Sequence, residues 1–154
     1  NLTLVVQAHV GESGETHGID PAPEMIRIAQ NKALRSGARV NFQIGVIEDI
    51  PFPNDYFDVI LSSLTIHHLP HALKREGFVN IRRALKPGGH LFIVDFEPPN
   101  NPAIRFLFTH LLGHDMMKVS SREYVPMLQE AGFANVEAGQ TKSRYMSFVK
   151  GSKM

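Results

Sequence analysis

The feature of this sequence that most constrains its fold is a repeated change between strand-like and helical periodicity. Residues 57–62 form a nearly continuous apolar run, which is typical of a parallel strand covered by helices on both faces. A helical pattern follows from about Ala72, and Pro87-Gly88-Gly89 is expected to end it before a second strand over residues 90–95. Two strands joined through a helix by short connections predict a parallel crossover unit.

The same alternation precedes this unit. Residues 16–19 are strand-like, a helix is predicted from about Ala22, and Gly37 stands where a left-handed residue would end that helix. Residues 40–44 then alternate like a half-buried strand. Strands and helices that alternate in this way indicate an α/β sheet.

The C-terminal part predicts a different arrangement. Residues 120–123 have the pattern of a capping box that opens a helix, and Gly132 is placed to close it. Residues 134–140 and 145–150 have the length and spacing of two strands joined by a polar turn. We therefore predict an open α/β sheet that is mainly parallel and ends in an antiparallel hairpin.

Composition places the chain among ordinary globular proteins. It has 154 residues with a formal net charge of +1, 43% hydrophobic and 20% charged residues, and no cysteine. The near-neutral charge gives no reason to expect nucleic acid as a partner, and no apolar run is long enough for an integral membrane segment. The lack of cysteine excludes disulfides and cysteine nucleophiles. We predict one domain over residues 1–154 and a cytoplasmic location.

The residues that follow the strands carry a family resemblance, because ligands of open α/β sheets bind at the carboxyl ends of the strands. The chain shows an ordered series there: Gly18-Ile19-Asp20, Glu48-Asp49-Ile50-Pro51-Phe52-Pro53, Phe57-Asp58-Val59-Ile60, Ser62-Ser63, His67-His68-Leu69 and Leu85-Lys86-Pro87-Gly88-Gly89. Together these motifs resemble class I S-adenosylmethionine-dependent methyltransferases, especially the branch that methylates ubiquinone and menaquinone precursors. The resemblance implies a Rossmann-like fold, S-adenosyl-L-methionine as cofactor, and methyl transfer to a small, apolar or aromatic acceptor.

The resemblance also implies what precedes the chain. Family members carry a strand and a glycine-rich loop before the helix that residues 1–10 resemble. We therefore expect that strand and loop to lie before Asn1, so that the domain is N-terminally incomplete here. Further along, residues 98–120 are predicted to form a lid-like insertion, with Glu97 in the linker that leads to it.

Asp20 is the first cofactor-binding residue that the resemblance implies, with Pro21 beside it. A carboxylate at this strand end would accept hydrogen bonds from both ribose hydroxyls, and an aspartate here would also suit the N-cap of the following helix. The two roles are compatible. Met25, one turn into that helix, would lie against the adenine edge or pack in the core.

The next two strand ends supply the other cofactor-binding candidates. Val46 and Ile47 occupy the positions where family members contact adenine, the first through an acidic or amide side chain and the second through its backbone amide. Valine cannot accept that hydrogen bond, so adenine recognition would depend on backbone groups, on Glu48 or Asp49, or on packing. Ser63 matches the position that holds the methionyl part of the cofactor, and a turn residue explains it equally well.

Two histidine-rich sets have a spacing that metal ligands use: His67, His68 and His71, and His110, His114 and Asp115. No cysteine or well-spaced carboxylate completes either set, and His67-His68 matches a packing motif of the family, so we predict no metal. His110 and His114 are candidates for a base because imidazole titrates near neutrality. An exposed or packing role is favoured for them, so no catalytic residue is assigned.

Two other functions stay open. Asp20 would also suit the adenosine ribose of a nicotinamide cofactor, although the predicted hairpin and Pro51-Phe52-Pro53 argue against a dinucleotide-dependent oxidoreductase. Val46 keeps open a catalytically weak, methyltransferase-like binding or regulatory protein. The sequence decides neither the methyl acceptor nor the oligomeric state.

Overall fold

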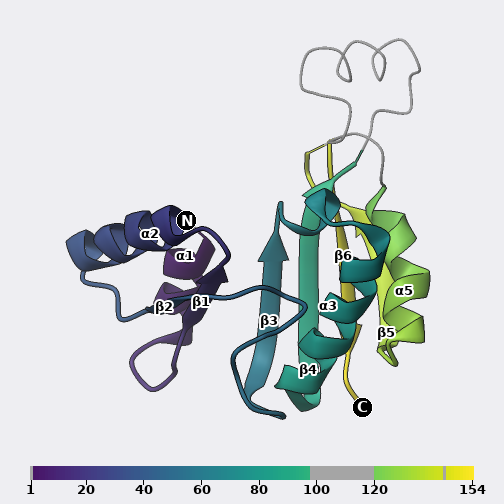
Figure 1. The fold of residues 1–154 in the computed structure, drawn as a ribbon, viewed down its shortest axis with the longest axis horizontal. Helices are drawn as coiled ribbons and strands as arrows, with labels where there is room; N and C mark the ends of the chain where they lie inside the picture. The colour runs from purple at the N-terminus through teal and green to yellow at the C-terminus, as the bar shows by residue number, and fades with distance from the viewer. Residues whose placement is uncertain (1, 98–119, 144) are drawn as a thin grey trace. The chain divides into compact units, whose positions relative to one another are not determined.

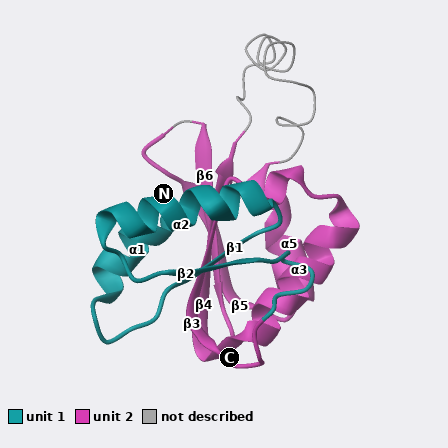
Figure 2. Ribbon diagram, turned by 60° about the vertical axis from the view of Figure 1, so that its left-hand side comes forward, with its two compact units in different colours: residues 1–51 teal, residues 52–154 magenta. Residues whose placement is uncertain are grey.

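A computed structural model describes residues 2–97, 120–143 and 145–154 (Figure 1). The chain divides into two compact units, residues 1–51 and residues 52–154, which are coloured separately in Figure 2. In chain order the elements are α1 (Leu2–Val10), β1 (His17–Asp20), α2 (Pro23–Ser36), β2 (Asn41–Ile44), β3 (Phe57–Ser63), η1 (Ile66–His68), α3 (His71–Ala84), β4 (Leu85–Phe96), η2 (Ser121–Glu123), α5 (Tyr124–Glu130), β5 (Ala134–Gln140) and β6 (Met146–Ser152).

The first unit is a short parallel sheet with helices. Strands β1 and β2 pair in parallel from His17 opposite Asn41 to Asp20 opposite Ile44. Helix α2 contacts both strands and buries Ile26 and Ala33. Parallel strands need a crossover between them, and α2 is that crossover.

The predicted end of α2 is confirmed. Gly37 adopts φ 68° and ψ 13°, the left-handed conformation that glycine reaches without a Cβ clash. The backbone N–H of Ala38 donates to the carbonyl of Ala33 at 3.1 Å, and the N–H of Gly37 donates to that of Leu34 at 3.3 Å. These bonds satisfy carbonyl groups that the last turn of a helix leaves unpaired.

The second unit is a mixed sheet in the order β3-β4-β6-β5. Strand β3 is parallel to β4, whereas β6 is antiparallel to both β4 and β5. Helices α3 and α5 lie together on one face of this sheet (Figures 1 and 2). The side chains with at most 1% exposure that form its apolar core are Ile66, Phe78, Ile81, Ala84, Leu85, Leu91, Ile93, Tyr124, Leu128 and Val149.

The predicted α/β fold class and the terminal hairpin are therefore confirmed. The capping-box region also opens a helix, first as η2 and then as α5, with Ser120 as N-cap. Its hydroxyl accepts from the backbone N–H of Arg122 at 3.2 Å rather than from Glu123. Gly132, at φ 88°, follows the end of α5 as expected.

The predicted start of β4 is wrong. The strand begins at Leu85, not at residue 90, and Pro87-Gly88-Gly89 lie within it. Backbone pairing explains the difference: Gly88 N–H donates to the Lys153 carbonyl at 2.7 Å, and Lys153 N–H donates to the Gly89 carbonyl at 3.0 Å. Pairing with Lys153 thus keeps Pro87-Gly88-Gly89 in the sheet, although the local preference of this tripeptide is for a turn.

Three predictions about organisation are left open. The strand expected before Asn1 and the single domain over residues 1–154 stay predictions. The lid-like insertion falls almost entirely on residues 98–119, outside the described part of the chain. Among the described helices, none is long and apolar enough to cross a membrane.

Replacing Gly37 tests the conformational origin of the α2 end. Nothing lies within 4 Å of a Cβ placed on Gly37, so a substitution there changes only the backbone preference. We expect Gly37→Ala to lower the free energy of unfolding by about 1–2 kcal/mol, because alanine disfavours left-handed φ and ψ. Gly37→Asn, which tolerates this conformation, should cost less. Equal stability of both variants and the wild type in urea denaturation would contradict this account.

Candidate functional site

The carboxyl ends of β1 and β2 bring four of the predicted cofactor-binding residues to one edge of the first unit. Asp20 ends β1 opposite Ile44, the last residue of β2, and Gly45 N–H donates to the Asp20 carbonyl at 3.3 Å. Pro21 follows directly on one strand, and Val46 and Ile47 follow on the other. This is the edge at which open α/β sheets bind ligands.

Only one of the two carboxylate oxygens of Asp20 accepts a hydrogen bond from the described part of the chain. Its Oδ1 accepts a 2.8 Å hydrogen bond from the backbone N–H of Ala22, and the described part of the chain gives Oδ2 no partner. Ala22 is itself the N-cap residue of α2, so Asp20 stabilises the approach to the helix without capping the helix N–H groups. One carboxylate oxygen is thus left for a ligand donor.

The remaining residues of this edge offer contact surface rather than charge. Met25 is 51% exposed on the first turn of α2, so it is not a core methionine. Val46 and Ile47 are half-buried at the start of a turn in which the N–H of Asp49 donates to the Val46 carbonyl at 3.4 Å. Neither side chain can accept a hydrogen bond, as the sequence indicated.

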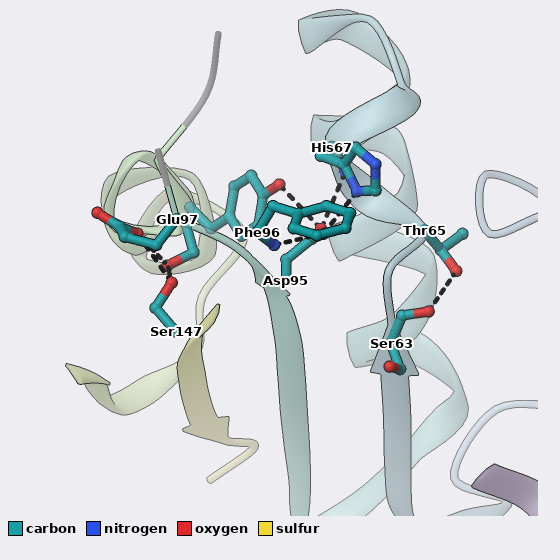
Figure 3. A network of polar contacts seen from close by, with 9 residues as sticks. Ser63, Thr65, His67, Asp95, Phe96, Glu97 and Ser147 are labelled. Carbon is teal, nitrogen blue, oxygen red and sulfur yellow. Dashed lines mark hydrogen bonds and ion pairs between the residues drawn. The ribbon is translucent and has the colours of Figure 1, made fainter. Parts of the chain in front are cut away.

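Ser63 belongs to the second unit, where it ends β3. The residue is exposed, and its carbonyl accepts from the Thr65 hydroxyl at 3.1 Å (Figure 3). The Thr65 bond is a local turn contact to the backbone of Ser63, so it does not decide between the turn and cofactor-binding interpretations of the serine side chain. A role in cofactor binding stays a prediction.

The sequence did not reveal a buried polar network around Asp95, at the carboxyl end of β4 (Figure 3). This carboxylate has no solvent exposure and accepts four hydrogen bonds: from the His67 backbone N–H at 3.0 Å, His67 Nδ1 at 2.5 Å, the Phe96 backbone N–H at 3.0 Å and the Tyr124 hydroxyl at 3.2 Å. The donors come from η1, β4 and α5. A single side chain therefore joins three elements of the second unit.

Burial shifts the pKa values of the groups around Asp95. The pKa of His67 is lowered, chiefly because its ring is buried, although the charge of Asp95 opposes this. The pKa of Tyr124 is raised by burial and by the neighbouring carboxylate, so its hydroxyl stays a donor. Burial also lowers the pKa of Lys74, which is 1% exposed with its Nζ 5.4 Å from the centre of the Tyr124 ring.

A second polar cluster adjoins the first. Glu97, predicted to be a linker residue, instead accepts hydrogen bonds from the hydroxyls of Ser120 and Ser147, both at 2.8 Å, and from that of Ser121 at 3.4 Å. The hydroxyls of Ser121 and Ser147 are themselves 2.5 Å apart. Glu97 therefore ties the end of β4 to the start of η2 and to β6.

The histidine predictions fall into two groups. His67 is 6% exposed, in line with the packing interpretation, whereas His68 is exposed with its ring centre 3.8 Å from that of His67. Over the described ranges no group of three or more His, Asp or Glu residues is arranged to hold a metal ion. His110 and His114 lie outside the described residues, so their role as bases stays a prediction.

Comparison with known proteins identifies the family. A methyltransferase domain family matches residues 1–89, more than half of the chain, and the chain belongs to that family. The ubiquinone/menaquinone biosynthesis C-methyltransferase UbiE of Geotalea daltonii is 34% identical over 122 residues, covering 77% of this chain and 49% of that protein. Phosphoethanolamine N-methyltransferase 1 of Arabidopsis thaliana is 31% identical over 146 residues, covering 92% of this chain and 29% of that protein.

Solved structures agree on the fold. A SAM-dependent methyltransferase from Aquifex aeolicus aligns with a TM-score of 0.78 at 22% identity, covering 97% of this chain and 74% of that one. The YcgJ protein from Bacillus subtilis aligns with a TM-score of 0.70 at 21% identity, covering 90% and 82%. The predicted resemblance and the Rossmann-like fold class are thus confirmed, while the chain spans about half or less of the length of the curated relatives it matches.

The cofactor that this family implies is S-adenosylmethionine, and the residues of the first unit suit its adenosine part. Oδ2 of Asp20 has no partner in the described part of the chain and can accept a hydrogen bond such as a ribose hydroxyl donates, and exposed Met25 and half-buried Ile47 offer apolar surface of the kind an aromatic base packs on. Val46 supplies no acceptor for the adenine amine. The carboxylate oxygen and the apolar side chains at this edge therefore fit a nucleoside. Recognition of its base would depend on packing and on backbone groups.

Removing the hydroxyl of Tyr124 should measure how much the Asp95 network stabilises the second unit. Tyr124→Phe deletes one donor to a fully buried carboxylate, so we expect the free energy of unfolding to fall by about 1–3 kcal/mol. Tyr145→Phe is a matched control, because Tyr145 is 36% exposed and water can replace a bond that its hydroxyl loses. Equal denaturation midpoints for the two variants would show that the Tyr124 bond contributes little.

The lowered pKa of His67 predicts a loss of stability on acidification. Below about pH 6.5 the unfolded chain binds a proton at this residue that the buried ring does not bind, so unfolding becomes more favourable. The loss should continue down to the lower pKa of the folded state. Urea denaturation should show that the free energy of unfolding decreases more from pH 7.5 to pH 5.5 in the wild type than in His67→Gln. Equal decreases in the two proteins would refute the lowered pKa of His67.

Proposed function

We propose that this chain is part of an enzyme that transfers a methyl group from S-adenosylmethionine to a small, apolar or aromatic acceptor. Family membership supports the reaction class, and the free oxygen of Asp20 at the edge of the first unit is the observation that carries the cofactor assignment. When bound, S-adenosylmethionine supplies a methyl group that is already activated by its positively charged sulfur. The protein's own task is then alignment and exclusion of water.

In this proposal the predicted residues contact different parts of the cofactor. Asp20 accepts from the ribose hydroxyls through Oδ2 while Oδ1 stays bonded to Ala22. Pro21 and Met25 lie along one side of the adenine, and Val46 and Ile47 along the other. Ser63 holds the methionyl part.

The acceptor is less closely defined than the donor. One relative is named a C-methyltransferase of quinone biosynthesis and another an N-methyltransferase of phosphoethanolamine, so related proteins act on chemically different acceptors. We retain a small, apolar or aromatic acceptor and a cytoplasmic location as parts of the proposal. No nucleic acid partner is proposed, because the formal net charge is only +1.

A methyltransferase-like binding protein is the second candidate, and Val46 is the observation that favours it. Without a hydrogen-bond acceptor for adenine, cofactor affinity depends on packing, and a protein of this family that binds weakly would serve as a scaffold. A nicotinamide-dependent oxidoreductase is disfavoured by the family match and by the antiparallel β5–β6 hairpin.

Calorimetric titration of the full-length protein separates these candidates. We expect S-adenosylmethionine and S-adenosylhomocysteine to bind, and NAD not to bind at the same concentrations. Binding without methyl transfer to any of a panel of small aromatic acceptors would favour the binding protein. Binding of NAD alone would overturn the proposal.

Substitution of Asp20 tests the ribose contact directly. Asp20→Ser keeps an oxygen for the Ala22 N–H but loses the second carboxylate oxygen, so cofactor binding should weaken by about 1–3 kcal/mol with little change in stability. Asp58→Ser is the matched control, because Asp58 is an exposed carboxylate paired with Lys86. Unchanged affinity for S-adenosylmethionine in Asp20→Ser would remove Asp20 from the cofactor site.

A further inference from the structure

In the part of the chain that the structure describes, the network around Asp95 leaves one buried ring nitrogen without a partner. Nδ1 of His67 lies 2.5 Å from Asp95 Oδ1, whereas Nε2 has no hydrogen-bond partner among the described residues, although the side chain is only 2% exposed. In a neutral imidazole one nitrogen donates and the other accepts. The contact with a carboxylate requires Nδ1 to carry the proton, so Nε2 presents a lone pair.

An unpaired buried acceptor calls for an explanation, since proteins pair nearly all such groups. A ligand would supply the missing donor, and two contacts hold the ring in a fixed orientation for it. The ring is fixed at two points, because both its Nδ1 and the backbone N–H of His67 bond to Asp95 (Figure 3). The ring of Phe96 packs against it in a T-shaped arrangement, with ring centres 5.2 Å apart and an interplanar angle of 84°.

The position of the pair is that of a ligand site. His67 lies in η1, shortly after β3 ends, and Asp95 lies near the end of β4, the parallel neighbour of β3. The pair is thus at the carboxyl end of the two parallel strands of the second unit, the end at which ligands of α/β sheets bind.

We propose that Nε2 of His67 binds the hydroxyl or amine group of the methyl acceptor and takes its proton during methyl transfer. Asp95 is a positioning residue that fixes the tautomer of the ring. The inference rests on the proposed function and narrows it to acceptors that lose a proton from oxygen or nitrogen. A small phenol is aromatic and also loses a proton from oxygen, so it meets both requirements.

Methyl transfer then proceeds with one bond formed, one bond broken and one proton moved. A lone pair on the acceptor oxygen or nitrogen forms a bond to the methyl carbon, and the carbon–sulfur bond breaks with its electron pair left on sulfur. The acceptor proton moves to Nε2, and the imidazolium is stabilised by Asp95. Release of that proton to solvent restores the neutral ring.

The groups that face His67 suit this role. Asp95 favours a charged ring, whereas burial, His68 and Lys74 oppose it, so the resting imidazole is neutral and free to act as a base. Tyr124 donates to the Asp95 oxygen that also accepts the His67 backbone N–H, while the other oxygen accepts from Nδ1 and from the Phe96 backbone N–H. Glu123 adds negative charge near Lys74 and Tyr124.

Nitrogen NMR of the histidine rings tests the proposal without requiring turnover. In the full-length protein with S-adenosylhomocysteine we expect His67 to be protonated on Nδ1 only. Phenol and benzylamine should shift the Nε2 resonance of His67, whereas anisole, which has the ring but no proton to donate, should not. A proton on Nε2 in the resting protein, no shift with either donor, or an equal shift with anisole would each overturn the proposal.

Two variants separate a base from a packing residue. With an acceptor that the enzyme methylates, His67→Gln should lower kcat at least about 100-fold with little change in KM, as expected for loss of a general base. His71→Gln, at the exposed start of α3, is the matched control and should keep wild-type kcat.

Cofactor affinity and kcat together distinguish a failure of the His67 proposal from a failure of the proposed function. Affinity for S-adenosylmethionine should be the same in wild type, His67→Gln and His71→Gln, because the cofactor residues are others. Loss of cofactor binding in the wild type itself would reject the proposed function. Normal binding and an unchanged kcat in His67→Gln would reject only the role of His67.

Discussion

The second unit depends on the burial of one carboxylate. An ionised Asp95 without solvent contact would cost several kcal/mol if its oxygens were unpaired, so the fold must bring donors to it. Those donors come from η1, β4 and α5, which the sequence separates by long intervals. The positions of three segments therefore depend on one another: the end of β4, the 3₁₀ turn after β3 and the start of α5.

Local patterns predicted most elements because each is encoded within its own segment. The C-cap at Gly37 and the strand from Ala134 to Gln140 needed only nearby residues, and both are found where the sequence places them. The start of β4 was predicted wrongly because its pairing partner is Lys153, far along the chain. Tertiary hydrogen bonds there override the turn preference of proline and glycine.

The same reasoning explains which site residues the sequence revealed. Asp20 stands out because an acidic residue directly follows a strand, and the structure leaves one of its oxygens available. The pairing of His67 with Asp95 was not predicted, because the two residues are 28 positions apart in the sequence. Lys74 has the sequence context of a surface lysine on a helix, and only the fold shows that it is buried against Tyr124. Side chains that meet across elements leave no periodic signal.

The strand order of the second unit sets a sequence of events during synthesis. Strand β5 precedes β6 in the chain, yet β6 lies between β4 and β5 in the sheet. Strand β5 therefore has no neighbour to pair with until residues 146–152 have left the ribosome. Until then the edge of β4 also lacks its antiparallel partner, and both strands expose backbone groups that attract other chains. The last residues of the sheet to be made are those that close it.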